Sequence, residues 1–117
     1  MTMTGFDYLA TMTEAQFQNT VERLADTFRW KWFHPPDDEA MRKTRGGFPD
    51  LVMVRDSLVI FAELKRQNSH PTKKQDEWHR ALSQVETFSG NVIVRIWRPG
   101  NLPEIAELLK KGWRVQL

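Results

Sequence analysis

A chain of 117 residues has room for one domain, since domains typically run to roughly 100–200 residues. Hydrophobic residues make up 40% of the chain and charged residues 27%, the balance of a globular protein, and no apolar run reaches the roughly 18 residues of a membrane span. The absence of cysteine excludes disulfides, cysteine-ligated zinc and cysteine nucleophiles. We therefore expect one soluble, cytoplasmic domain over residues 1–117, with residues 1–12 as an N-terminal arm.

The net charge of +2 is unevenly distributed along the chain. Acidic residues outnumber basic ones as far as Phe28, so the basic excess lies in the remainder. Basic residues gather at Arg42-Lys43-Arg45, at Lys65-Arg66 and at Lys73-Lys74. Such an excess points only weakly to a polyanionic partner, and on charge alone a solvated lysine-rich face explains it better.

The first third of the chain predicts a helix, a short strand and a loop. The capping box Thr13-x-x-Gln16 opens a helix, in which apolar residues recur at helical intervals to about Phe28. The segment from Trp30 to Phe33 is expected to be a short strand that Pro35-Pro36 ends. The polar residues that follow predict a long loop as far as Gly47.

Two β-rich runs, residues 50–55 and 58–65, lie on either side of Asp56-Ser57, which we expect to form a hairpin turn. Counting outward from this turn places Asp50 directly opposite Glu63. Both faces of the hairpin are otherwise apolar, as in strands that are covered on both sides.

The second half of the chain predicts two more helices and a strand. The capping box Thr72-x-x-Gln75 opens a helix, residues 91–97 form an apolar strand, and Pro103 starts a helix that Gly112 ends. Residues 113–117 are a candidate edge strand. The order α-β-β-β-α-β-α predicts an α/β fold with a mixed central sheet between helices.

Two carboxylates and an ammonium group are expected to meet at the open end of the hairpin. The Cβ atoms of directly opposed residues such as Asp50 and Glu63 lie about 4.5–5.5 Å apart, and Lys65 shares their face. Carboxylates this close repel each other, and a divalent cation relieves the repulsion. Oxygen ligands favour Mg²⁺ or Mn²⁺, and Lys65 would stabilise developing negative charge. The alternative is an ordinary hairpin that carries an ion pair.

The segment GFPDLVMVRDSLVIFAELK, residues 47–65, together with residues 71–82, resembles the virus-type replication-repair nuclease (VRR-NUC) family of the PD-(D/E)XK superfamily. The likeness extends to TEAQFQ at residues 13–18 and to the Ile96-Trp97-Arg98-Pro99 turn. It implies a restriction-endonuclease-like core and Mg²⁺- or Mn²⁺-dependent hydrolysis of DNA phosphodiesters. It also implies branched substrates such as Holliday junctions, which a homodimer would resolve because one copy supplies one cutting site.

The resemblance implies particular metal ligands and catalytic groups. Asp50, Glu63 and the backbone carbonyl of Leu64 would bind the metal. Lys65 would be the catalytic lysine, and Gln75 would help to position water or phosphate.

An acidic residue of the first helix would also reach the metal, directly or through water. Glu14 matches that residue, and Glu22 is its rival. No core motif position is substituted, but the acidic run Asp37-Asp38-Glu39 lies where a DNA-facing loop would be basic.

Basic residues near the motif are candidates for contacts with the DNA backbone. Lys73 and Lys74 stand in the first turn of a predicted helix, where the helix dipole disfavours cations, which favours a role in phosphate contact. The full set of candidates is Arg42, Lys43, Arg45, Arg66, Lys73 and Lys74. Two other functions fit the same residues: a flap or nicking nuclease subunit of a phage assembly, and a non-catalytic DNA-binding module.

Overall fold

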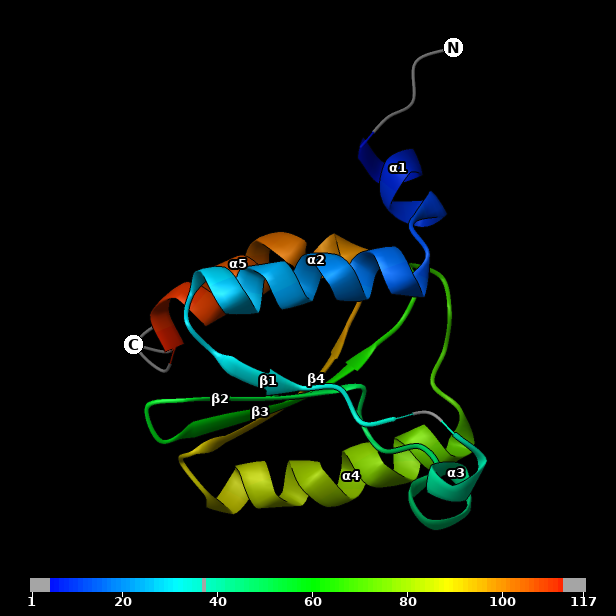
Figure 1. Ribbon diagram of the computed structural model, residues 1–117, viewed down its shortest axis with the longest axis vertical. Helices are drawn as coiled ribbons and strands as arrows, with labels where there is room; N and C mark the ends of the chain where they lie inside the picture. The colour runs from blue at the N-terminus through cyan, green and yellow to red at the C-terminus, as the bar shows by residue number, and fades with distance from the viewer. Residues whose placement is uncertain (1–4, 37, 113–117) are drawn as a thin grey trace.

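The computed structural model, which describes residues 5–36 and 38–112, is a four-stranded sheet with helices on both faces (Figure 1). The strands are β1 (Lys31–Phe33), β2 (Leu51–Arg55), β3 (Leu58–Leu64) and β4 (Val92–Trp97), which lie in that order across the sheet. β1, β2 and β3 are antiparallel neighbours, and β4 runs parallel to β3. The predicted α/β class and mixed sheet are therefore confirmed.

The helices form two layers (Figure 1). α2 (Glu14–Thr27) and α5 (Leu102–Lys111) cover one face of the sheet, and α4 (Lys73–Phe88) covers the other. A 3₁₀ turn, η1 (Pro99–Asn101), leads from β4 into α5. Two short helices, α1 (Gly5–Thr11) and α3 (Glu39–Arg45), lie outside these layers, and α3 lies beside the start of α4.

Both predicted capping boxes are present. The Thr13 hydroxyl accepts the Gln16 backbone N–H at 3.1 Å, and the Gln16 side chain accepts the Thr13 N–H at 2.9 Å. Thr72 and Gln75 make the same reciprocal pair at 3.2 and 2.8 Å. Each pair satisfies two backbone groups that a helix start leaves without an intrahelical partner, so α2 and α4 begin where the sequence predicts.

The hairpin of β2 and β3 has the predicted register. Leu51 pairs with Ala62, which makes Asp50 and Glu63 the next opposed positions. Asp56 and Ser57 have φ angles of 51° and 74°, as a two-residue type I′ turn requires. The turn therefore fixes which side chains meet at the far end of the hairpin.

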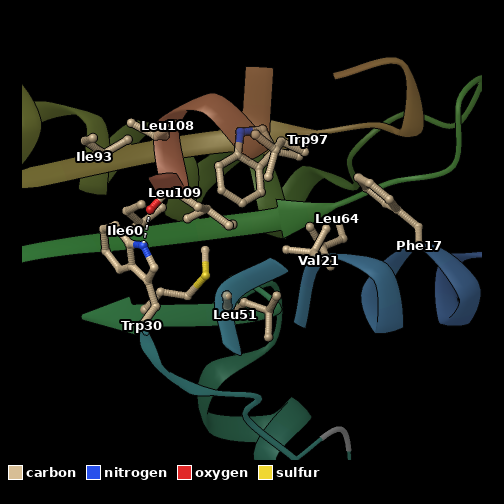
Figure 2. Packing of buried hydrophobic residues seen from close by; sticks show 14 of the residues in the cluster. Phe17, Val21, Trp30, Leu51, Ile60, Leu64, Ile93, Trp97, Leu108 and Leu109 are labelled. Atoms are coloured by element: carbon tan, nitrogen blue, oxygen red, sulfur yellow. Dashed lines mark hydrogen bonds between the residues drawn. The ribbon is translucent and has the colours of Figure 1, made fainter. Parts of the chain in front are cut away.

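The main core lies between the sheet and the α2–α5 layer (Figure 2). Trp30 is 3% exposed, and its indole N–H donates to the Leu109 carbonyl at 2.7 Å, which ties the start of β1 to α5. The other face is covered less completely, because no residue of α4 is fully buried. The fully buried side chains of the main core include those of Phe17, Val21, Leu51, Met53, Ile60, Ile93, Ile105 and Leu109.

Two segments differ from the sequence-based expectation. The predicted N-terminal arm contains the helix α1. The prediction of an unbroken loop from Pro35 to Gly47 was wrong, because α3 forms within it. Asp38 caps α3 by accepting the Met41 N–H at 2.8 Å, and the helix has too few apolar residues for its period to be visible in the sequence. The candidate edge strand at residues 113–117 lies outside the described residues.

The outer edge of β4 is occupied by a side chain from α4. The Glu86 carboxylate accepts the Val94 backbone N–H at 2.7 Å and the Arg95 guanidinium at 3.1 Å. A side chain on an edge N–H blocks pairing with a further strand.

Among the described residues, no helix is both long and apolar enough to span a bilayer.

Candidate active site

The candidate active site lies on the α4 face of the sheet, where the β2–β3 hairpin opens. Glu63 is 4% exposed and Lys65 is 8% exposed, and among the described residues they are the charged side chains that are buried. Asp50 lies opposite Glu63 and is partly exposed. Since burying a charge is costly unless it is paired or bound to a metal, this buried cluster marks the site more strongly than the motif alone.

Asp50 and Gln75 hold the cluster together. The Asp50 carboxylate accepts the Leu64 backbone N–H at 2.8 Å. The Gln75 amide donates to the Glu63 carboxylate at 3.3 Å, while its oxygen accepts the Thr72 N–H. The capping glutamine of α4 is therefore also a site residue, and one side chain fixes both the helix start and the Glu63 carboxyl.

Burial raises the pKa of Glu63 to about 10, with a hydrogen bond to Asp50 and the charge of Asp50 as further causes. The nearby Lys65 ammonium acts in the opposite direction and lowers this pKa. Without a cation, the raised pKa therefore favours the protonated form of Glu63 at neutral pH. A divalent ion bound to the pair would replace that proton and satisfy both carboxylates.

The backbone of β3 supplies a further oxygen on the same side. The N–H and C=O groups of one strand residue point to the same neighbour, and the N–H of Leu64 points to Asp50. The Leu64 carbonyl therefore faces the side on which the Asp50 carboxylate lies. Two carboxylates and a carbonyl are the oxygen donors that Mg²⁺ and Mn²⁺ take, so these residues fit the predicted ion.

The two acidic candidates of α2 have different surroundings. The charge of Glu14 contributes to the raised pKa of Glu63, which places it within electrostatic reach of the pair. Glu22 instead accepts the Gln18 amide at 2.7 Å. In the part of the chain that the structure describes, no three His, Asp or Glu side chains lie close enough together to hold a metal ion. Glu14 is therefore a more distant partner of a two-carboxylate site.

The loop before β2 carries two features that hold the site in place. Gly47 has a φ of 87°, and a Cβ there would lie 2.4 Å from the Lys74 carbonyl carbon. Phe48 packs edge-on against Phe61 of β3 at 6.1 Å and against Trp78 of α4 at 5.0 Å between ring centroids. The loop is thus pressed against the first turn of α4, which brings Gln75 over the carboxylates.

Sequence reasoning missed His34, which immediately follows β1. Its Nδ1 lies 2.7 Å from the Asp50 backbone carbonyl. The pairing of β1 with β2 explains this contact. Phe33 pairs with Val52, so the residue that follows β1 lies near Asp50. That register could not be counted from the sequence, since no short turn joins the two strands.

The predicted DNA-contacting residues separate into two groups. Arg42 and Lys43 of α3 and Lys74 of α4 line one groove of about 430 Å³, together with Trp78. Lys73 and Arg66 are exposed and do not line this groove. The side chain of Arg45 lies outside the described residues.

The raised pKa of Glu63 predicts how metal-free stability depends on pH. The folded protein keeps a proton between pH 4.5, the ordinary value, and about pH 10 that the unfolded chain has lost. The free energy of unfolding should therefore fall as the pH rises through that window. Urea unfolding in EDTA at pH 5, 7 and 9 should show this slope, and the Glu63→Gln variant should show a shallower one. Parallel slopes for the two proteins would contradict the retention of a proton by Glu63.

The chain has no significant match to the known family models, to curated proteins or to solved structures. The interpretation of the site therefore rests on its residues and geometry.

Proposed function

We propose that this chain is a divalent-metal-dependent endonuclease that hydrolyses DNA phosphodiesters, with a restriction-endonuclease-like core as in the VRR-NUC family. The observation that carries the proposal is the buried Glu63–Lys65 pair with Asp50 opposite Glu63 at the end of the hairpin. An ordinary hairpin ion pair would lie exposed and would not bury a carboxyl group and an ammonium group beside a second, partly exposed carboxylate. The substrate class that we propose is branched DNA such as a Holliday junction, cut by a homodimer.

Asp50, Glu63 and the Leu64 carbonyl would hold Mg²⁺ or Mn²⁺. A bound ion would neutralise negative charge on the phosphate oxygens and would lower the pKa of the attacking water. The reaction adds the water oxygen to phosphorus and breaks the opposite P–O bond, and the leaving oxygen takes a proton.

The chain's own groups orient and stabilise that reaction. Lys65 is buried and lies within electrostatic range of Glu63, so its charge stabilises the negative charge that grows on the phosphate. Gln75 keeps the Glu63 carboxyl in place through its hydrogen bond. The groove with Arg42, Lys43 and Lys74 would hold the DNA backbone beside the site.

The cleavage assay that tests this proposal uses a synthetic four-way junction, a flap and a linear duplex of equal length, with Mg²⁺ or Mn²⁺. We expect cleavage that EDTA abolishes, with the junction cut fastest and by paired symmetric nicks. Faster cutting of the flap would favour a flap nuclease over a resolvase. No metal-dependent cleavage of any substrate would contradict the proposal and favour a non-catalytic DNA-binding module.

The basic groove makes a prediction about salt dependence. The variant Lys74→Ala should bind DNA more weakly, and the slope of log K against log salt concentration should fall in magnitude by about 0.9, the value for one phosphate contact. Fluorescence anisotropy at several salt concentrations measures both quantities. Lys110→Ala, an exposed lysine of α5 in the opposite helical layer, should leave the slope unchanged. Equal slopes for the native protein and Lys74→Ala would remove Lys74 from the interface.

A further inference from the structure

A small cavity lies directly beside the acidic pair. Its volume is about 140 Å³, and it shares Asp50 and Gln75 with the candidate active site. The residues that form its other walls include His34, Pro36, Met41 and Phe48. We call it the His34 cavity.

The volume of the His34 cavity limits what it can hold. It is well below the roughly 300–1,000 Å³ of pockets that enclose drug-sized ligands. It is close to the volume of about 150 Å³ of an engineered cavity that binds benzene. The cavity therefore suits a single six-membered ring and not a whole nucleotide.

The walls combine flat apolar surfaces with a fixed polar group. The rings of Pro36 and Phe48 and the thioether of Met41 offer surfaces against which a ring can pack. The Asp50 carbonyl can only accept a hydrogen bond, so Nδ1 of His34 carries the proton and donates to it. The orientation of the imidazole is thereby restrained, and among the described residues no hydrogen bond engages Nε2, which is the nitrogen available to a ligand.

The cavity is continuous with the proposed path of the DNA strand. Arg42 and Gly46 line both the His34 cavity and the basic groove that contains Lys74. A strand whose backbone follows that groove and whose phosphate lies at Asp50 and Glu63 would bring the neighbouring base to the cavity.

We propose that the His34 cavity receives one unpaired pyrimidine base of the strand that is cut, next to the scissile phosphate. This inference rests on the proposed nuclease function and adds the feature of the substrate that the site recognises. A base inside a duplex cannot enter, and extruding it costs least where it is already unpaired. Where a branch point holds an unpaired base, the cavity gives a physical reason for a preference for branched over linear DNA.

The experiment measures binding to the metal-free full chain in EDTA, so it does not depend on cleavage. The probes are the tetranucleotide of thymidines, the same oligonucleotide with one abasic position, and the tetranucleotide of deoxyadenosines. We expect the thymidine probe to bind about tenfold more tightly than the abasic one, the gain typical of one stacked base, and more tightly than the adenosine probe. Equal affinities for the thymidine and abasic probes would overturn the proposal, and equal affinities for thymidine and adenosine would overturn the pyrimidine preference.

Two variants locate the effect in the cavity. His34→Ala should remove most of the difference between the thymidine and abasic probes. Phe33→Ala alters the preceding aromatic residue, which is 55% exposed and outside the cavity, and should leave that difference intact. A difference that persists in His34→Ala but disappears in Phe33→Ala would place the base elsewhere and contradict the proposal.

Failure of this inference and failure of the nuclease function give different results. Metal-dependent cleavage that is equally fast beside an abasic position and beside a pyrimidine would overturn the base pocket and leave the nuclease function standing. A thymidine preference in binding without cleavage of any DNA would overturn the nuclease function and support the pocket.

Discussion

Replacing Glu63 with glutamine is expected to lower the rate of metal-dependent DNA cleavage by at least about a hundredfold. Changes to groups that merely support metal ligands already cost about 10–100-fold in affinity or activity, and Glu63 is a proposed ligand itself. The fold should survive, because a neutral glutamine resembles the protonated carboxyl that the metal-free protein already buries. Single-turnover cleavage rates and circular dichroism spectra of the same preparations check both expectations.

Matched variants separate the proposed ligands from other acidic residues. Asp50→Ala and Lys65→Ala should abolish cleavage as well, since one removes a ligand and the other the stabilising cation. Glu14→Gln should slow cleavage, whereas Glu22→Gln should not, because Glu22 is engaged by Gln18 and the charge of Glu14 reaches Glu63. Cleavage at the native rate by folded Glu63→Gln protein would contradict the assignment of the site.

The variant Gly47→Ala is expected to destabilise the fold by about 2–5 kcal/mol. Holding an L-residue at positive φ costs roughly 1–2 kcal/mol, and overpacking typically adds about 1–3 kcal/mol. The overpacking is severe here because the added methyl group would meet backbone, 2.4 Å from the Lys74 carbonyl carbon and 2.7 Å from the Gln75 nitrogen. Urea unfolding at fixed pH measures the change in free energy.

The control for this substitution is Gly90→Ala. A Cβ at Gly90 would have no atom within 4 Å, and its φ is not in the left-handed region, so the free energy of unfolding should change little. The two variants add the same methyl group, so any difference between them reports the local fit. A small effect at Gly47 would show that the loop does not press against α4 and would weaken the placement of Gln75 over the carboxylates.

The parts of the fold that the sequence predicts correctly are those fixed by local chemistry. The capping boxes at Thr13 and Thr72 need only residues three positions apart. The turn at Asp56-Ser57 sets the register of β2 and β3 by counting alone, and so it predicts that Asp50 faces Glu63. The acidic pair could be predicted for this reason.

The features that the sequence did not predict depend on contacts between distant segments. The seven-residue helix α3 has a capping residue, Asp38, but its apolar residues do not recur at helical intervals. The sequence therefore predicts a loop there. The contact of His34 with Asp50 depends on the pairing of β1 with β2, which no short turn specifies. The cavity beside the site forms where these segments meet, so it is visible only in three dimensions.

The acidic pair, of which Glu63 is buried and Asp50 partly exposed, gives the proposed ion a physical role at this end of the hairpin. Two carboxyl groups this close destabilise the fold when both are charged, and the raised pKa of Glu63 reflects first its burial and then the hydrogen bond and the charge of Asp50. Lys65 offsets part of the charge but also occupies a buried position. A divalent cation compensates both carboxylates at once, which a second lysine could not do with the same geometry.

Crystallography with Mn²⁺ tests the central claim most directly. Crystals of the protein soaked in Mn²⁺ should show an anomalous density peak between the carboxylates of Asp50 and Glu63, about 2.0–2.2 Å from oxygens of both side chains. The Leu64 carbonyl should complete the protein donors. Carboxylates that turn away from each other, with no anomalous peak near them at saturating Mn²⁺, would contradict the account.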